Sequence, residues 1–262
     1  MNKDKLKGLL WGSFLGDVYA SSDALSLYGR QMLWLTEYIT KSKVYDPFAF
    51  GDIWKKKMRQ EDGHIDKASS DTLANLKSGR TYLGAGSGSH DLSVVGRHAP
   101  IMYTLKGMDE MLESVKFHTC LTHMSKEAID ASKYVAEVTL AMIYNLDVAN
   151  TLHERAKFYG KEVEAEVEKG FKLRDRPLKM VLRELGTGSD IEGALALTVY
   201  FLLNYHDNFS TLMQENLKAG GDASARGMVM GMIVGARYGF EAISPLWIEE
   251  IAEYSTLQKL IN

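Results

Sequence analysis

Two stretches of the chain carry glycine at every fourth position: residues 7–20, KGLLWGSFLGDVYA, and residues 220–239, GGDASARGMVMGMIVGARYG. The repeated glycines are Gly8, Gly12 and Gly16 in the first stretch and Gly227, Gly231, Gly235 and Gly239 in the second. A glycine inside a helix costs about 1 kcal/mol relative to alanine, so this repetition needs an offsetting gain. Residues four apart lie on one helix face, where small residues let a second backbone come close. The pattern therefore predicts two helices packed tightly against each other at the centre of the fold.

Each glycine stretch contains a Gly-Asp pair. Asp17 follows Gly16 towards the end of the first stretch, and Asp222 follows Gly221 at the start of the second. If the two helices are antiparallel, both carboxylates lie at the same end of the helix pair. Asp222 is also suited to cap its helix, with Arg226 one turn further on. Two interpretations are open: a functional pair of carboxylates, or a helix cap with an ion pair.

Apolar residues recur at three-to-four spacing along much of the chain, which has only four prolines and almost no period-two alternation. Residues 33–39 and 129–142 are clear examples. Residues 153–174 alternate Glu and Lys around Val163 and Val167, which predicts a solvated amphipathic helix with ion pairs at i,i+4. No stretch is typical of an interdomain linker. We predict an all-α protein that forms a single domain over residues 1–262.

One long irregular region interrupts this pattern, residues 78–98, SGRTYLGAGSGSHDLSVVGRH. Its five glycines and four serines predict a loop without regular structure. Such long loops are more often functional than idle. Backbone amides and hydroxyls here suit a pyrophosphate group. The residues that would contact it are Ser87, Gly88 and Ser89. His90 and Asp91, which follow directly, are candidates for proton transfer.

The composition limits the partners of this protein. Thirty-one basic and 34 acidic side chains leave a formal charge of −3, so no net field attracts nucleic acid or an anionic membrane. No apolar run approaches the roughly 20 residues of a membrane span, the nearest being residues 227–236. The single cysteine, Cys120, cannot form an intrachain disulfide, which indicates either a reducing compartment or a fold that needs no disulfide. We expect a cytoplasmic protein that binds neither nucleic acid nor a membrane.

Five segments distributed along the whole chain are similar to one protein family. They are residues 7–20 with Gly16 and Asp17, residues 84–100 ending in Arg97, Ala99 and Pro100, residues 120–132 with Thr122 and His123, residues 186–197 leading into residues 220–239, and the closing Pro245, Leu246 and Trp247. In this order they resemble the ADP-ribosylglycohydrolase family, which includes enzymes that remove ADP-ribose from proteins and the related J1 crystallins. The resemblance implies an all-α orthogonal helical bundle with a cleft for ADP-ribose. It also implies two Mg²⁺ ions held by clustered carboxylates, the usual arrangement in the family.

Most of the acidic residues of the family's metal site are missing here. Where the family has a Thr-Asp-Asp-Thr cluster, residues 28–32 read YGRQM. Where its late helix reads Asp-x-Asp-Thr, Asp222 is followed by Ala-Ser-Ala. Mg²⁺ demands near-octahedral oxygen coordination, which Asp222 and Ser224 alone do not supply. The resemblance therefore leaves Asp222 and Ser224 as an incomplete magnesium site, with reduced or absent magnesium dependence.

Two carboxylates can still hydrolyse a glycosidic bond by general acid and general base catalysis. The candidate catalytic residues are Asp17, Asp23, Asp91 and Asp222. Asp23 lies one place short of Ala24, which occupies the position where the family has a further acidic residue seven places after Asp17.

Arg30 occupies the position of a missing metal ligand, and two interpretations of it are open. In the first, Arg30 supplies the missing positive charge and binds a phosphate or carboxylate through a forked pair of hydrogen bonds. In the second, Arg30 pairs with Asp222 and holds an empty site shut. Arg97 and His123 are further candidates for ligand contact, with a structural role as the alternative for each.

The resemblance thus predicts a hydrolase that acts on a glycosidic bond to ribose in an ADP-ribosyl or related nucleotide substrate. The alternative is a catalytically silent relative, either a binding module for ligands of the ADP-ribose type or a structural protein of the crystallin kind. Loss of the acidic cluster favours the silent relative. Retention of Asp222, Arg97 and the polar loop favours a working pocket.

Overall fold

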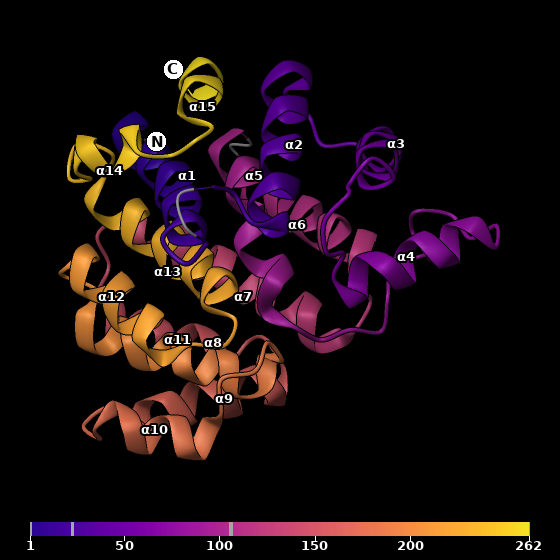
Figure 1. Ribbon diagram of the computed structural model, residues 1–262. Helices are drawn as coiled ribbons and strands as arrows, with labels where there is room; N and C mark the ends of the chain where they lie inside the picture. Colours follow the sequence, from indigo (N-terminus) through magenta and orange to yellow (C-terminus); the bar gives the residue numbers. More distant parts are fainter. Residues whose placement is uncertain (1, 22–23, 105–106, 262) are drawn as a thin grey trace.

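The computed structural model describes residues 2–21, 24–104 and 107–261, and Figure 1 shows the arrangement of the helices. The helices are α1 (Lys3–Val18), α2 (Leu27–Ser42), α3 (Pro47–Met58), α4 (Lys67–Lys77), the 3₁₀ helix η1 (Leu92–His98), α5 (Ala99–Thr104), α6 (Met108–Thr122), α7 (Lys126–Ile143), α8 (Val148–Ala156), α9 (Gly160–Leu173), α10 (Leu178–Leu185), α11 (Ile191–Tyr205), α12 (Phe209–Ala219), α13 (Ala223–Tyr238), α14 (Pro245–Glu249) and α15 (Tyr254–Ile261). Within the described residues, the only β pairing consists of two isolated bridges, Ser87 with His123 and Asp91 with Asp190. The prediction of an all-α fold is confirmed.

The two glycine-rich stretches form α1 and α13, which pack against each other over most of their length. A Cβ atom on Gly12 would lie less than 3.0 Å from the backbone of Gly231, and one on Gly16 would lie equally close to Gly227. The residue numbers rise in one helix as they fall in the other, so the helices are antiparallel. Figure 1 shows α1 and α13 side by side. The predicted close helix pair is confirmed.

Other helices surround this pair and complete the core. Helix α13 packs against α7 and η1, α1 packs against α5, and α9 packs against α11. Apolar side chains such as Leu9, Phe14, Val229 and Met232 are buried around the pair. The helices run in several directions rather than side by side in parallel, as expected for an orthogonal bundle (Figure 1).

The structure corrects two of the local predictions. The final third of the expected 78–98 loop is η1, because the apolar side chains of Leu92, Val94 and Val95 are buried and Asp91 caps the first turn. The expected continuous helix over residues 153–174 is the last turn of α8 followed by α9. The break occurs because Gly160 adopts a φ of 85°, a left-handed conformation that glycine accepts without strain.

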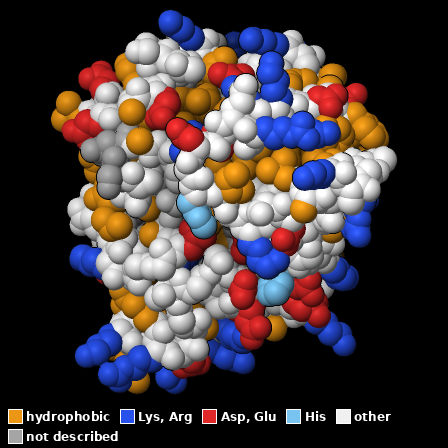
Figure 2. Space-filling view, turned by 45° about the vertical axis from the view of Figure 1, so that its right-hand side comes forward, with side chains coloured by type: hydrophobic (Ala, Val, Ile, Leu, Met, Phe, Trp, Pro, Cys, Tyr) orange, Lys and Arg blue, Asp and Glu red, His pale blue; other side chains and the backbone are white. Residues whose placement is uncertain are grey.

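The surface shows no concentration of one charge on the face that Figure 2 presents. Acidic and basic side chains both occur in its upper and lower halves. Attraction to a polyanion needs a concentrated basic area, which this face lacks. In the part of the chain that the structure describes, no helix is both long and apolar enough to cross a membrane.

Candidate functional site

A cavity of about 370 Å³ lies at the end of the α1–α13 pair that carries the two Gly-Asp sequences. Three segments form its walls: the start of α2, the segment 59–66 between α3 and α4, and the start of α13. The lining residues are Ser26, Leu27, Tyr28, Arg30, His64, Asp66, Asp222 and Ser224. Ligand pockets for small molecules usually start at about 300 Å³, so the cavity is large enough for part of a nucleotide.

Asp17 lies beneath this cavity and has no exposed surface. Its two carboxylate oxygens accept hydrogen bonds from Ser26, one from the backbone N–H at 2.8 Å and one from Oγ–H at 2.5 Å. Burial raises the pKa of the Asp17 carboxyl to about 7, and the nearby charge of Asp222 adds to this shift, while the Ser26 hydrogen bonds oppose it. Because Asp17 is fully buried, this structure leaves none of its surface open to a ligand, and its catalytic role stays a prediction.

Replacing Asp17 with asparagine is expected to change how stability depends on pH. The folded carboxyl, with a pKa of about 7, holds its proton more tightly than the unfolded one at 3.8, so its contribution is complete below about pH 4 and is lost as the pH rises through 7. The unfolding free energy of Asp17→Asn relative to wild type should therefore rise by about 2–3 kcal/mol between about pH 5 and pH 8. Urea denaturation at the two pH values measures this. The exposed Asp109→Asn serves as the control, and an equal pH dependence in both variants would contradict the prediction.

Asp222 forms one edge of the cavity. It caps α13, accepting the amide of Ala225 at 3.1 Å, and its Oδ2 accepts a hydrogen bond from the Tyr28 hydroxyl at 3.3 Å. Burial raises the pKa of the Asp222 carboxyl above its ordinary value, although these two hydrogen bonds oppose the shift. The cap is confirmed, but the ion pair with Arg226 is not formed. Arg226 instead donates to Asn216 and to a backbone carbonyl.

Arg30 presents a positive charge on the opposite wall. It does not pair with Asp222, as one interpretation of the sequence required. Its guanidinium donates to both oxygens of Glu61, with the shortest contact at 2.7 Å, and to the Leu25 carbonyl at 2.9 Å. A third of the Arg30 side chain remains exposed. The guanidinium is thus held in place by Glu61 while part of it stays open to the cavity.

The segment 59–66 contributes two residues that the sequence did not single out, His64 and Asp66. Asp66 caps α4 and accepts hydrogen bonds from the backbone and the hydroxyl of Ser69 at 2.8 and 2.7 Å. An Asp directly before a helix is a recognisable cap. That signal predicts the start of α4, but nothing in it shows that this helix start lies at the cavity.

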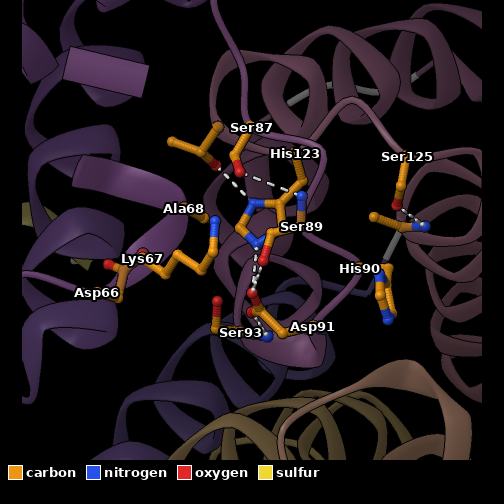
Figure 3. Close-up of polar contacts among 12 residues, drawn as sticks. Asp66, Lys67, Ala68, Ser87, Ser89, His90, Asp91, Ser93, His123 and Ser125 are labelled. Carbon is orange, nitrogen blue, oxygen red and sulfur yellow. Dashed lines mark hydrogen bonds and ion pairs between the residues drawn. The ribbon is translucent and has the colours of Figure 1, made fainter. Parts of the chain in front are cut away.

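A second polar network, drawn together with Asp66 in Figure 3, joins the 78–98 region to the end of α6. His123 contacts Asp91 through Nε2 at 3.0 Å and Thr122 through Nδ1 at 2.9 Å. Arg97 donates a hydrogen bond to the Thr122 hydroxyl oxygen at 2.8 Å. The Thr122 hydroxyl can therefore donate its own proton to His123 Nδ1, and His123 donates its ring proton from Nε2 to Asp91. Burial would raise the pKa of Asp91, but hydrogen bonds from His123, Ser93 and Ser89 outweigh it and hold the pKa below its usual range. Asp91 therefore stays ionised and is unsuited to donate a proton.

Arg97 and His123 are buried within this network, with exposures of 2% and 0%. Their burial favours the structural alternative for each, since Arg97 donates to Gln31 and Thr122 and His123 contacts Asp91 and Thr122. Ser87 is also buried, and its hydroxyl donates to Asp71 at 2.7 Å. The Ser89 hydroxyl donates to Asp91 at 2.9 Å. These side chains hold the loop in shape.

The other two loop candidates face a different part of the surface. Gly88 and His90 line a second cavity of about 420 Å³ against α9 and the start of α11. Figure 3 shows His90 pointing away from Asp91 and His123. The His90 ring lies 3.8 Å from the Asp190 carboxylate. His90 and Asp222 therefore do not belong to one site.

The predicted site residues are thus divided among several places. Asp222, Arg30 and Ser224 line the first cavity. Ser224 also donates a hydrogen bond to the backbone carbonyl of Asp17 at 3.3 Å. Asp23 lies outside the described residues. The residues that sequence reasoning missed are Tyr28, His64 and Asp66, together with Glu61, which holds Arg30.

The side chains at this end of the molecule do not fit a binuclear magnesium centre. Both oxygens of Asp17 are taken by Ser26, and those of Asp222 accept from a backbone amide and from Tyr28. The positive charge of Arg30 lies on the same cavity. Within residues 2–21, 24–104 and 107–261, no group of three or more His, Cys, Asp or Glu side chains is arranged to hold a metal ion. Mg²⁺ requires near-octahedral oxygen coordination, which this set does not provide.

Comparisons with known proteins agree with this fold. The chain superposes on a solved structure described as an "ADP-ribosylglycohydrolase-related protein complex", with a TM-score of 0.79, 19% sequence identity, and coverage of 99% of this chain and 96% of that one. At this identity the likeness shows the fold. No curated protein matches the chain. A family model described as ADP-ribosylglycohydrolase matches residues 1–262. The chain therefore belongs to the ADP-ribosylglycohydrolase family.

Proposed function

We propose that this protein hydrolyses a glycosidic bond to ribose in an ADP-ribosyl or related nucleotide substrate, without a binuclear magnesium centre. The observation that carries the proposal is that two carboxylates, Asp222 and Asp66, line one cavity together with Tyr28. Tyr28 donates its hydroxyl proton to Asp222 at 3.3 Å, and burial together with the charges of Asp222 and Asp66 raises the pKa of the Tyr28 phenol. A pair of carboxylates in unlike environments is the basic requirement for glycoside hydrolysis.

The two carboxylates take opposite roles in this proposal. Burial raises the pKa of Asp222, which suits it to donate a proton to the leaving atom as the bond to the ribose C1′ breaks. Asp66 lies at the N-terminus of α4, where the helix amides favour a negative charge. It accepts a proton from a water molecule, and the oxygen of that water bonds to C1′. The products are the ribose with a hydroxyl group on C1′ and the protonated leaving group, and the proton on Asp66 returns to Asp222 through solvent.

Arg30 binds a phosphate of the substrate in this proposal. Its fixed guanidinium matches the geometry of phosphate oxygens, and the exposed part of the side chain faces the cavity. The phosphate then either binds Arg30 alongside Glu61 or displaces Glu61 from Arg30. The positive charge thus takes the place of the charge that Mg²⁺ supplies in relatives with complete acidic clusters.

Arg30→Ala is expected to weaken ADP-ribose binding by about 10- to 100-fold, because a hydrogen-bonded charge on the phosphate is lost. Isothermal titration of ADP-ribose into wild type and variant, with and without Mg²⁺, measures the change. Arg80→Ala removes the same charge from an exposed position that does not line the cavity and should bind as wild type does. Unchanged affinity in Arg30→Ala would rule out the charge-replacement role.

The direct test of the activity is incubation of the protein with ADP-ribosylated substrates in the presence of a metal chelator, followed by chromatography of free ADP-ribose. Release that survives chelation supports the proposal. Absence of release both with and without Mg²⁺ would contradict it.

A second candidate is a binding protein for ligands of the ADP-ribose type that carries out no catalysis. The burial of Asp17 and the absence of any acidic residue in residues 28–32 favour it. This candidate predicts ADP-ribose binding without any release of ADP-ribose from substrates. For either candidate, the single Cys120 supports a reducing compartment such as the cytoplasm.

A further inference from the structure

Asp17 connects two walls of the first cavity although it is buried beneath them. Its carboxylate accepts the two hydrogen bonds from Ser26, which precedes α2. Its backbone carbonyl accepts the hydroxyl of Ser224 in the first turn of α13 at 3.3 Å. One residue at the end of α1 therefore contacts the starts of both α2 and α13.

Ser26 links Asp17 to the first turn of α2. As the N-cap residue, its Oγ accepts the amides of Tyr28 at 3.1 Å and Gly29 at 3.4 Å. A hydroxyl has one proton to donate, and here that proton goes to Asp17, which leaves the oxygen lone pairs facing the helix amides. The hydroxyl orientation that caps α2 is therefore the one that Asp17 favours.

The first turn of α2 also rests directly on the Asp17 carboxylate. A Cβ atom on Gly29 would lie less than 3.0 Å from Oδ2 of Asp17, so only glycine allows this approach. The residue before it, Tyr28, donates its hydroxyl proton to Asp222 at 3.3 Å. A shift of this turn would displace both Tyr28 and Arg30 from the cavity.

We propose that Asp17 is a positioning residue that fixes the first turn of α2 and thereby places the Tyr28 hydroxyl on Asp222. Asp17 touches no ligand in this role. The effect on catalysis rests on the proposed hydrolase function, whereas the effect on the position of Tyr28 does not.

Ligand-free crystal structures of Asp17→Ala and Ser26→Thr give the first test. Threonine keeps a hydroxyl that can donate to Asp17 while its oxygen caps α2, so Tyr28 should stay on Asp222 in Ser26→Thr and move away in Asp17→Ala. Tyr28 in its wild-type place in Asp17→Ala overturns the proposal, whether or not the protein hydrolyses anything. If Asp17→Ala fails to fold, Ser26→Ala removes the same link and should displace Tyr28 in the same way.

Kinetics give the second test. Asp17→Ala should lower kcat by about 10- to 100-fold, because small misplacements of catalytic groups have effects of this size. Ser26→Thr, which keeps the hydroxyl that donates to Asp17, should retain most of the activity. In a Tyr28→Phe background the same Asp17→Ala substitution should add little, because both substitutions remove the hydrogen bond from the Tyr28 hydroxyl to Asp222. Effects that multiply independently, or a loss of kcat in Ser26→Thr as large as that in Asp17→Ala, overturn the proposal.

Ser13→Ala is the matched control. Ser13 lies one turn earlier on α1, is fully buried, and donates to the Gly96 carbonyl at 3.0 Å, away from the cavity. It should cost stability and leave kcat and the position of Tyr28 unchanged. A general loss of stability is thereby distinguished from a positioning effect.

Discussion

Gly12→Leu is expected to leave little folded protein, with a loss in unfolding free energy of at least about 3 kcal/mol. Leucine favours a helix more than glycine does, so helix propensity alone would stabilise the variant by up to about 1 kcal/mol. The close packing of α1 against α13 outweighs this gain, so the net effect on the unfolding free energy is a loss. The new Cβ would lie less than 3.0 Å from the backbone of Gly231, and a helix backbone cannot move aside as a flexible side chain can. Overpacking a rigid contact costs about 1–3 kcal/mol or more even for smaller insertions.

Urea denaturation followed by circular dichroism measures this loss. Gly63→Ala is the control, because a Cβ at that position meets nothing within 4 Å. Gly231→Leu should match Gly12→Leu, since the two glycines form the same contact from opposite sides. A Gly12→Leu variant as stable as Gly63→Ala would show that α1 and α13 are not packed as described.

Asp222→Asn is expected to lower kcat by about 10²- to 10⁴-fold, the usual contribution of a general acid. Asparagine is also a good N-cap residue, so α13 keeps its hydrogen bond to the amide of Ala225 and the variant should remain folded. The variant loses the transferable proton together with the oxygen that accepts the Tyr28 hydroxyl, and Tyr28→Phe measures the second loss alone. Asp190→Asn is the matched control, since Asp190 also precedes a helix but lies outside the cavity.

The pH dependence of wild-type activity gives a second readout of the same residue. An acid must be protonated to act, so activity falls as the pH rises through the pKa of Asp222. Burial raises that pKa, which moves the alkaline fall in kcat/KM to higher pH than an ordinary aspartate would give. The fall should disappear in Asp222→Asn. Full activity in Asp222→Asn would show that Asp222 is not the general acid.

The central helix pair was predictable because its signal lies within two short stretches. Glycine at every fourth position is costly unless another backbone lies against it, so each glycine-rich stretch predicts that a second helix packs closely against it. The position of Asp17 and Asp222 at one end followed from the antiparallel arrangement. The sequence did not show that Asp17 is closed off, because that depends on Ser26, nine residues further along, folding back over it.

The walls of the cavity were only partly predictable for a similar reason. Arg30 was recognised from its position, but its partner Glu61 lies 31 residues away in an irregular segment without any motif. Asp66 carries the ordinary signal of a helix cap, and its place at the cavity depends on how α3 and α4 pack. Arg97 and His123 were recognised as important residues, yet sequence alone does not distinguish a ligand contact from a buried hydrogen-bond network.

We propose that the cavity between α2, α13 and segment 59–66 binds an ADP-ribose-type ligand with the positive charge of Arg30 in place of metal ions. Isothermal titration of ADP-ribose into wild-type protein, once with a chelator and once with excess Mg²⁺, tests it most directly. We expect binding of equal affinity in both. Binding that appears only with Mg²⁺, or no binding in either, would contradict the account.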